Sequence, residues 1–508
     1  MTPAAGGGTP PRVVAAIDQG TTSSRCLLFA RDGTIVGSAQ QEHRQFTPRP
    51  GWVEHDPVEI WDRTAQVVAG ALEAAGLDGA AVAAVGITNQ RETTVVWDPA
   101  TGESLAPAIV WQDTRTAGLA AELDAAVGTE RLRELTGLPA ATYFSGPKLR
   151  WLLDHEDGLR DRARAGRAVF GTVESWLVWK LTGGAVHRTD ATNAGRTLMM
   201  DLGKLRWSEE LLEALGVPGR MLPEIAPASH PEAWGATAAD GPFGRRIPIA
   251  GVIGDQQAAL LGQLRRRPGE AKCTYGTGAF LLMHTGTEAV ASKAGLLTTV
   301  AYSDAARVEY ALEGSVAVAG SLVQWLRDQL GFAESAAGVE RLALQVEDSG
   351  GAVIVPAFSG LFAPWWRSDA RGVICGLTRH TDRRHLARAA IEASAFQVRE
   401  VIEAMRADAG HAPGELRVDG GMTVSALLLS FQADVLGIPV VRPRCVETTA
   451  LGAAVAAGLA VGFWESETEL AGALEEDARF EPTMSDAERD ERLAAWSKAV
   501  ERSFGWVG

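Results

Sequence analysis

The sequence has 508 residues, of which 46% are hydrophobic and 22% are charged, and its formal net charge at pH 7 is −15. A chain of this length exceeds what one hydrophobic core supports, so we expect two domains. The acidic balance argues against nucleic acid or an anionic membrane surface as a partner, because both are polyanions. A phosphorylated ligand would therefore be held by local hydrogen-bond donors.

Cysteine usage and apolar patterning indicate a cytoplasmic protein without membrane insertion. Residues 1–12 lack the apolar core of a secretory signal. The uncharged stretch from Ala450 to Trp464 is too short and too rich in glycine to span a bilayer, and its small residues favour a buried helix. Four cysteines that lie far apart, with no CxxC pair, are typical of a reducing compartment. They are Cys26, Cys273, Cys375 and Cys445.

The first motif is an apolar strand that runs into a turn rich in glycine and threonine, after which another apolar strand follows, over Val13–Phe29. A second copy lies at Lys272–Met283. Glycine admits positive φ and leaves room for an anion, while hydroxyl and turn N–H groups supply donors. Because strands follow both turns, neither is a P-loop or a dinucleotide fingerprint. One such turn is common in hairpins, but the pair predicts a phosphate held between duplicated domains.

Asp18 closes the first strand and opens its turn. A carboxylate there would repel a polyphosphate unless a cation lay between them, so the position indicates Mg²⁺. The alternative is an Asx turn that only stabilises the hairpin.

The next elements predict an α/β fold. Thr34–Gln40 reads as a third strand, and Asp56 with Pro57 begins a helix as N-cap and first helical residue. A further strand is predicted over 81–88. A meander, a helix and a strand in this order imply a mixed sheet flanked by helices. The apolar residues expected on the buried face of the helix step by three and four. They are Val58, Trp61, Ala65, Val68 and Leu72.

Two polar runs follow predicted strands and form candidate site walls. Asn89-Gln90-Arg91-Glu92 comes directly after the strand that ends at residue 88. Arg91 can donate and Glu92 can accept, so together they can fix hydroxyl groups; a surface ion pair is the alternative. Gly254-Asp255-Gln256-Gln257 follows a strand predicted at Ile247–Ile253 and opens a helix. Asp255 there is either a helix N-cap or a catalytic base for an attacking hydroxyl.

The second half of the chain repeats this organisation. A helix is predicted at Gly320–Leu330, and strands at Gly351–Pro356 and Glu415–Asp419. Val418-Asp419-Gly420-Gly421 then forms a strand–turn–helix site suited to the ribose and phosphates of a nucleotide. The charged stretch Met484–Arg502 predicts a solvent-exposed terminal helix.

These motifs resemble the glycerol kinases of the FGGY carbohydrate kinase family, from about residue 12 to 482. Arg91-Glu92 after Asn-Gln is far more specific than the two glycine- and threonine-rich turns, because the sibling pentulose kinases differ there. The matching stretches are Ile17–Arg25, Pro50–Pro57, Gly86–Thr94, Tyr143–Gly146, Gly254–Ala259, Thr274–Gly278, Ala311–Gly314 and Arg417–Gly421.

The resemblance implies a fold of two actin-like (ribonuclease H-like) ATPase domains with a hinged interdomain cleft. It places an N-terminal domain for polyol and phosphate binding at 12–260 and a C-terminal nucleotide-binding domain at 261–482, with a terminal helix at 483–508. The implied activity is that of a transferase: a kinase that moves the γ-phosphoryl group of ATP to a terminal hydroxyl of glycerol. A kinase for another short polyol or a ketose, or a catalytically inactive nucleotide sensor, is the alternative.

The resemblance also implies the site residues. Asp255 corresponds to the base, and Asp18 to the carboxylate on the metal side. The glycerol contacts correspond to Arg91, Glu92, Tyr143, Asp255 and Gln256, with Trp111 and Phe280 as apolar walls. The nucleotide contacts correspond to Thr21, Thr22, Ser23, Arg25, Thr277, Gly320, Gln324, Gly421 and Ser425.

The sequence departs from the family pattern at three places: beside the adenine base, in the segment 363–367, and in a regulatory loop. Ser425 stands where the family often has Asn, so we expect one adenine contact to be lost or bridged by water. Ala363-Pro364-Trp365-Trp366-Arg367 differs from the usual Ala-Pro-Tyr-Trp-Asp. Gly244-Arg245-Arg246 partly matches a loop that in the family binds fructose 1,6-bisphosphate between subunits of a tetramer; a solvated arginine pair is the alternative. The resemblance also implies a homo-oligomer, either a dimer or a tetramer.

Overall fold

The computed structural model describes residues 12–507, so the expectation about a secretory signal falls almost wholly outside the described residues. The chain forms two compact units. Unit 1 contains the described residues up to 264 together with 299–310 and 448–473, and unit 2 contains 265–298, 311–447 and the residues from 474 onward. The chain thus passes from one unit to the other at five points. The predicted domain limits and the hinged cleft stay predictions.

Unit 1 is built on a mixed five-stranded sheet of order β13-β5-β1-β2-β3. The hairpin of β1 and β2 is antiparallel, whereas β5 pairs in parallel with both β1 and β13. The strands are β1 (Val13–Gln19), β2 (Ser23–Ala30), β3 (Ile35–Glu42), β5 (Val82–Asn89) and β13 (Ile249–Gly254). The carboxyl ends of three neighbouring parallel strands therefore meet at one edge, which is where α/β proteins place their ligands.

Two helices cover opposite faces of this sheet. Helix α1 (Pro57–Ala75) begins after Asp56, whose carboxylate accepts a hydrogen bond from the backbone N–H of Val58. It packs Ile60 and Val67 into the core with Ala15 and Ile17 of β1. Val68 and Leu72 are buried as predicted, but Val58 is 48% exposed, so the buried face is rotated from the predicted one and shares only part of it.

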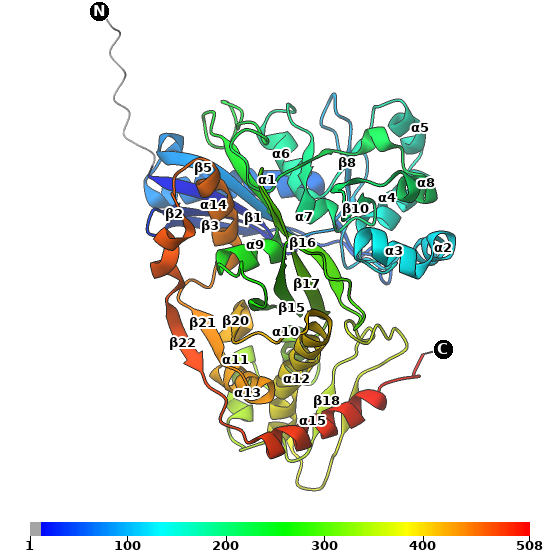
Figure 1. The fold of residues 1–508 in the computed structure, drawn as a ribbon, viewed down its shortest axis with the longest axis vertical. Helices are drawn as coiled ribbons and strands as arrows, with labels where there is room; N and C mark the ends of the chain where they lie inside the picture. Colours follow the sequence, from blue (N-terminus) through cyan, green and yellow to red (C-terminus); the bar gives the residue numbers. More distant parts are fainter. Residues whose placement is uncertain (1–11, 508) are drawn as a thin grey trace, which may run out of the picture. The chain divides into compact units, whose positions relative to one another are not determined.

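The opposite face is covered by α14 (Thr448–Ala460), which Figure 1 shows in orange beside the blue strands of unit 1. Its buried surface consists largely of alanine and glycine. A Cβ atom on Gly86 of β5 would lie 2.1 Å from the carbonyl oxygen of Ala453, so helix and strand meet backbone to backbone. The predicted buried helix of small residues is confirmed.

The other elements of unit 1 are short. Strand pairs are formed by β4 (Glu54–His55) with β7 (Ala108–Ile109), β6 (Val95–Trp97) with β8 (Val169–Gly171), β9 (Arg188–Asp190) with β12 (Glu224–Ala226), and β10 (Met200–Asp201) with β11 (Arg206–Trp207). The helices are α2 (Ala117–Val127), α3 (Thr129–Thr136), α4 (Ser145–His155), α5 (Leu159–Arg164), α6 (Val173–Leu181), α7 (Ala191–Ala194), α8 (Glu209–Leu215) and α9 (Asp255–Gly262).

The sheet of unit 2 repeats the topology of unit 1. Its order is β16-β17-β15-β14-β20-β21-β22, in which β14 and β15 form an antiparallel hairpin and β20 pairs in parallel with β14 and β21. Strands β16 and β17 run on into the segment 299–310 of unit 1. The strands are β14 (Ala271–Tyr275), β15 (Ala279–Gly286), β16 (Leu297–Ser303), β17 (Val308–Val316), β20 (Leu416–Asp419), β21 (Val440–Pro443) and β22 (Glu476–Phe480), and β18 (Val353–Val355) pairs separately with β19 (Val373–Cys375). The predicted duplication is therefore visible in strand order and direction.

The helices of unit 2 enclose one hydrophobic core around a long buried helix, α12. The terminal helix α15 buries Trp496, Ala499 and Val500 in this core, so the prediction of a solvent-exposed helix is wrong for one of its faces. The helices are α10 (Gly320–Asp328), α11 (Ala336–Ala343), α12 (Arg383–Ala409), α13 (Ala426–Leu436) and α15 (Asp486–Glu501).

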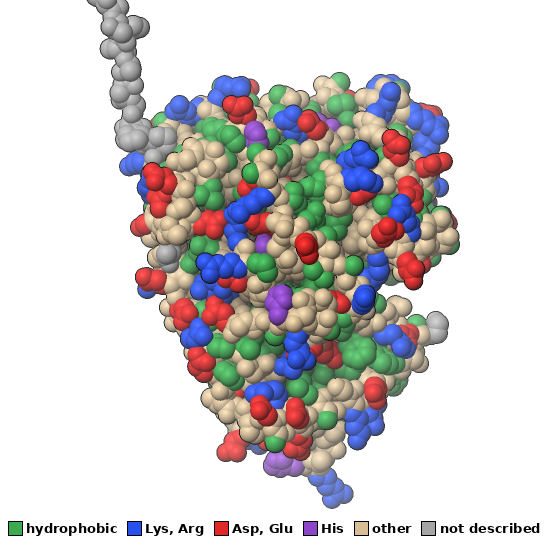
Figure 2. Space-filling view, viewed as in Figure 1, with side chains coloured by type: hydrophobic (Ala, Val, Ile, Leu, Met, Phe, Trp, Pro, Cys, Tyr) green, Lys and Arg blue, Asp and Glu red, His purple; other side chains and the backbone are tan. Residues whose placement is uncertain are grey.

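The surface carries charges of both signs, and Figure 2 shows acidic and basic side chains interspersed over the visible face. None of the helices within residues 12–507 combines the length and apolar character that crossing a bilayer requires.

Candidate active site

Three strand ends of unit 1 bring the predicted site residues together. Gln19 at the end of β1 pairs with Asn89 at the end of β5, and Asn89 pairs with Gly254 at the end of β13. The chain segments that follow these strands carry the phosphate turn, Arg91 with Glu92, and Asp255. Residues as far apart in the sequence as Gln19 and Gly254, which are 254 minus 19, or 235, positions apart, therefore lie at one edge of the sheet.

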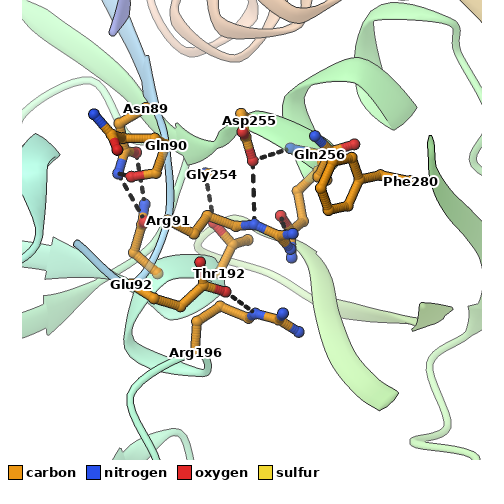
Figure 3. A network of polar contacts seen from close by, with 12 residues as sticks. Asn89, Gln90, Arg91, Glu92, Thr192, Arg196, Gly254, Asp255, Gln256 and Phe280 are labelled. Atoms are coloured by element: carbon orange, nitrogen blue, oxygen red, sulfur yellow. Dashed lines mark hydrogen bonds and ion pairs between the residues drawn. The ribbon is translucent and has the colours of Figure 1, made fainter. Parts of the chain in front are cut away.

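Arg91 and Asp255 form the central ion pair of this edge (Figure 3). The Nε atom of Arg91 lies 3.1 Å from Oδ1 of Asp255, and an Nη1 hydrogen is donated to Oε1 of Gln257 at 3.2 Å. The Arg91 side chain is 2% exposed and that of Asp255 is 28% exposed. A Cβ atom at position 254 would lie 2.9 Å from the Arg91 side chain, so Gly254 leaves the space that the arginine fills.

This geometry decides two alternatives raised by the sequence. Arg91 and Glu92 are both buried, so they are not a surface ion pair. Asp255 is the first residue of α9, whereas Gly254 occupies the N-cap position, so Asp255 is not the helix cap. Its carboxylate instead accepts from the backbone N–H of Gln256 at 2.7 Å and keeps a solvent-facing side.

Glu92 is fixed by a buried arginine that the sequence did not single out. The residue adopts φ of +62°, a conformation that costs energy for a side chain with a Cβ atom. Its carboxylate accepts the Nε hydrogen of Arg196 at 2.6 Å (Figure 3). The Arg196 guanidinium also packs over the rings of Tyr143 and Phe144, at 5.4 and 5.3 Å from their centroids. One buried cation thus links Glu92 to Tyr143.

An aromatic pair borders the same edge of the sheet. The rings of Trp111 and Tyr143 meet edge to face with centroids 5.5 Å apart, and the indole N–H of Trp111 is donated to the hydroxyl of Thr21 at 2.9 Å. Lys148 supports the segment before α4 by donating to the carbonyl oxygens of Thr142 and Tyr143 at 2.5 and 2.6 Å. Burial lowers the pKa of the Lys148 ammonium to about 7.

A buried polar network supports the strand ends from below. Glu174 accepts hydrogen bonds from Asn89 at 2.9 Å and from Thr189 at 2.8 Å. Thr192 accepts the backbone N–H of Gly254 at 2.8 Å (Figure 3). It donates its own proton to Asp190 at 2.6 Å. Burial and the nearby Asp190 carboxylate raise the pKa of Glu174 to about 7, and burial raises that of Asp190 to about 6.

The phosphate turn of unit 1 places a carboxylate beside hydroxyl groups. Thr21, Thr22 and Ser23 follow the end of β1, and the turn is closed by the N–H of Gly20, which donates to the carbonyl of Ser23 at 2.9 Å. Asp18 is buried and forms an ion pair with Arg25, its cross-strand neighbour on β2.

Asp18 is compatible with one mode of Mg²⁺ binding, in which the ion is shared between the protein and a substrate phosphate. Within residues 12–507 no group of three or more His, Cys, Asp or Glu is placed to hold a metal ion. Mg²⁺ is commonly bound by one or two carboxylates together with substrate phosphates, and a single Asp18 beside a phosphate turn fits that mode.

The predicted nucleotide residues of unit 2 line one cavity of about 300 Å³, which we call the unit 2 cavity. Its floor is the turn between β14 and β15 and the segment after β20, and helices α10, α11 and α13 form its walls. Phe280 lies on β15, outside the lining of this cavity. The predicted residues that line the cavity are Thr277, Gly320, Gln324, Gly421 and Ser425.

The comparison with known proteins agrees with this architecture. Residues 13–262 match the FGGY family of carbohydrate kinases, N-terminal domain, and residues 271–461 match its C-terminal domain. The chain therefore belongs to the FGGY family of carbohydrate kinases.

Within that family its relatives include glycerol kinases. The glycerol kinase of Beijerinckia indica is 56% identical over 501 residues, which are 98% of this chain and 99% of that protein. The glycerol kinase of Renibacterium salmoninarum is 57% identical over 498 residues, which are 97% of this chain and 98% of that protein. The crystal structure of Plasmodium falciparum glycerol kinase with ADP has a TM-score of 0.89 at 38% identity and covers 97% of this chain and 99% of that one.

Proposed function

We propose that the protein is an ATP-dependent glycerol kinase, which transfers the γ-phosphoryl group of ATP to a terminal hydroxyl of glycerol and gives sn-glycerol 3-phosphate and ADP. The observation that carries this proposal is the buried Arg91 beside Asp255 at the edge where three parallel strands end. The relatives named as glycerol kinases, which match nearly the full chain at 56–57% identity, support the same acceptor.

Asp255 is the proposed catalytic base. Its carboxylate is exposed on one side, where a substrate hydroxyl can approach, and is oriented by Arg91 and by the N–H of Gln256. Phosphoryl transfer has a loose transition state with little charge on the attacking oxygen, so a correctly positioned carboxylate suffices to accept the proton.

The glycerol hydroxyls are proposed to be read by a set of donors and acceptors of known geometry. Arg91 donates, Glu92 accepts, and Arg196 holds Glu92 in place. Tyr143 and Gln256 add further polar contacts, and Trp111 with Phe280 would cover the carbon backbone. A small polyol needs donors and acceptors of this kind because each of its hydroxyls is both.

The nucleotide is proposed to use both phosphate turns. Thr21, Thr22, Ser23 and Arg25 would contact the phosphates, and the residues of the unit 2 cavity would contact the nucleoside. Asp18 would hold the Mg²⁺ that accompanies ATP, and that ion offsets the charge on the transferring phosphate. On this proposal the domain at 12–260 binds polyol and phosphate, and the domain at 261–482 binds nucleotide.

Further proposals concern the setting of the enzyme. We propose a cytoplasmic enzyme, because its donor would be ATP and its four cysteines form no disulfide. The family resemblance supports a homo-oligomer. Arg245 and Arg246 are exposed after a turn at Gly244, which supports a fructose 1,6-bisphosphate site; a solvated arginine pair remains the alternative. Activity against millimolar fructose 1,6-bisphosphate, with light scattering alongside, decides between them.

The function is tested by a coupled assay that detects ADP from purified protein, ATP and Mg²⁺ with a panel of polyols and ketoses. Glycerol should give the highest kcat/KM, and the product should be sn-glycerol 3-phosphate. A higher kcat/KM for another polyol or a ketose would assign that substrate instead. Nucleotide binding without turnover of any acceptor would identify a catalytically inactive sensor.

A further inference from the structure

The unit 2 cavity contains a carboxylate that the sequence did not single out. Glu340 projects from α11 and lines the cavity together with Ser425 at the start of α13. Apolar side chains of Val323, Ile391 and Leu428 line the same space and suit the faces of a flat ring. A carboxylate among apolar walls is a strong means of orienting a bound group.

The hydrogen bonds of Ser425 determine what this corner of the cavity can recognise. The Ser425 hydroxyl donates to Oε1 of Glu340 at 2.6 Å. As the N-cap of α13, the Oγ atom of Ser425 also accepts a hydrogen bond from the backbone N–H of Leu428 at 3.1 Å. A serine hydroxyl carries one proton, so its single donor is used by Glu340. The pair therefore presents only acceptors to the cavity, since the carboxylate retains free lone pairs.

We infer that Glu340 selects the base of the nucleotide by accepting a hydrogen bond from an exocyclic amine. This inference rests on the proposed function, because it takes the unit 2 cavity to be the nucleoside site. Adenine carries an amine at position 6, whereas hypoxanthine carries a carbonyl oxygen there. That oxygen would face the acceptors of Glu340 and Ser425 without a proton between them, which disfavours binding.

Ser425 orients the Glu340 carboxylate, which is the group that contacts the base. Glu340 and Ser425 lie on different helices, and their hydrogen bond fixes the glutamate rotamer relative to α13. The start of α11 is itself capped by Ser335, which accepts the N–H of Gly338 at 3.1 Å. A short serine at position 425 therefore acts through Glu340, as a positioning residue, and leaves the contact with the base to the longer side chain.

The test compares ATP with ITP as phosphoryl donors for glycerol. In the unchanged protein, kcat/KM for ATP should exceed that for ITP by about 10- to 100-fold, because Glu340 is only half-buried. Glu340→Gln keeps the shape but adds an N–H that can face a carbonyl, so the ratio should fall about tenfold. Ser425→Ala should lower kcat/KM for ATP a few-fold and retain the preference. Glu347→Gln, an exposed glutamate outside the cavity lining, is the matched control and should change nothing.

Two results would overturn the inference: equal use of ATP and ITP by the unchanged protein, or an ATP-to-ITP ratio that Glu340→Gln leaves within twofold. Failure of the proposed function is distinguishable, because it would show as no phosphorylation of glycerol with any nucleotide. Calorimetry with ADP and IDP then decides independently of turnover. Tighter binding of ADP that weakens in Glu340→Gln supports the inference, and equal affinities reject it.

Discussion

Asp255 and Arg91 have different roles in the proposed reaction: Asp255 accepts the proton, and Arg91 binds the substrate. Both side chains are held at the end of β13 and β5 by contacts to the chain itself, so their separation does not depend on a bound ligand. Substitutions at the two positions should therefore affect different kinetic constants.

Asp255→Asn should lower kcat by about 10²- to 10⁴-fold while glycerol and ATP still bind, because Asn keeps the shape of the side chain but cannot accept the proton. Steady-state kinetics with both substrates varied measure this split. Asp240→Asn replaces an exposed aspartate and serves as the control. Turnover within a few-fold of the parent would leave Asp255 with a structural role only.

Arg91→Ala should reduce kcat/KM for glycerol by the equivalent of roughly 1–3 kcal/mol, because a buried hydrogen-bonding group is removed and its partners lose their donor. Nucleotide affinity, measured by calorimetry, should change little. An equal loss of ATP affinity would place Arg91 outside the glycerol pocket.

Glu174 should make stability depend on pH. Its pKa is raised to about 7 in the folded chain, above an ordinary value of 4.5, so the folded state binds the proton more tightly than the unfolded state. The resulting stability is complete below pH 4.5 and is lost as pH rises to 7, by up to about 3 kcal/mol. Gln is neutral at every pH and resembles the protonated glutamic acid, so the thermal melts of the parent and of Glu174→Gln should be similar at low pH and should diverge as pH rises, with the parent falling below the variant. A constant difference between the two melting temperatures would contradict the shift.

At the scale of elements, the short helix α7 supports the end of β13 through the hydroxyl of Thr192, which accepts a hydrogen bond from the N–H of Gly254. Thr192→Val is close in shape but leaves the N–H of Gly254 buried without its acceptor, at a cost of roughly 1–3 kcal/mol. We expect a lower melting temperature and a kcat reduced by about tenfold, with KM for glycerol nearly unchanged. Thr192→Ser retains the hydroxyl and should restore both values. If Thr192→Ser lost as much kcat as Thr192→Val, the methyl group of Thr192 would matter and the hydrogen bond would not.

The elements that sequence predicts well are those with local signals. Asp56 and Pro57 mark the start of α1, and the polar runs after buried strands mark the site at Arg91 and Asp255. The rotation of α1 was not predictable, because two neighbouring apolar stripes both fit helical spacing and only packing on the sheet selects the one with Ile60.

The partners of the site residues carry no such signal. Arg196 lies 104 positions from Glu92, and Thr192 lies 62 positions from Gly254. The first contact depends on how the segment after α7 meets the segment after β5, and the second on how α7 meets β13 in the folded chain. The polar run from Thr189 to Asn193 could have drawn attention as an unusual buried segment, but its partners could not have been named. The glutamate of the unit 2 cavity was missed for the same reason, since Glu340 meets Ser425 only across 85 positions.

At the scale of the whole molecule, the two units are not consecutive pieces of sequence. Residues 448–473 return to unit 1, and α14 covers one face of its sheet at backbone distance from Gly86 and Gly251. The match to the family's C-terminal domain continues to residue 461. The domain limits along the sequence therefore do not reveal that residues 448–473 belong to unit 1.

A fragment of residues 12–264 should therefore fail to fold alone, because it lacks α14 and exposes the sheet face that this helix covers. We expect no cooperative thermal melt from the isolated fragment, measured by circular dichroism. Co-expression with residues 265–508 should yield a soluble complex that melts cooperatively. A cooperative melt of the isolated fragment would show that α14 is dispensable for unit 1.

The return of α14 also sets the order in which the protein can mature on the ribosome. Thr448 follows Leu264 by 448 minus 264, or 184, residues. At synthesis rates of about 5–20 residues per second, the first 264 residues wait roughly 10 to 40 s for the helix that completes their sheet. During that interval the glycine-lined face of the nascent sheet is open to water, to chaperones and to other nascent chains. The translation speed of residues 265–447, most of which belong to unit 2, thus governs how long this protein is exposed to misassembly.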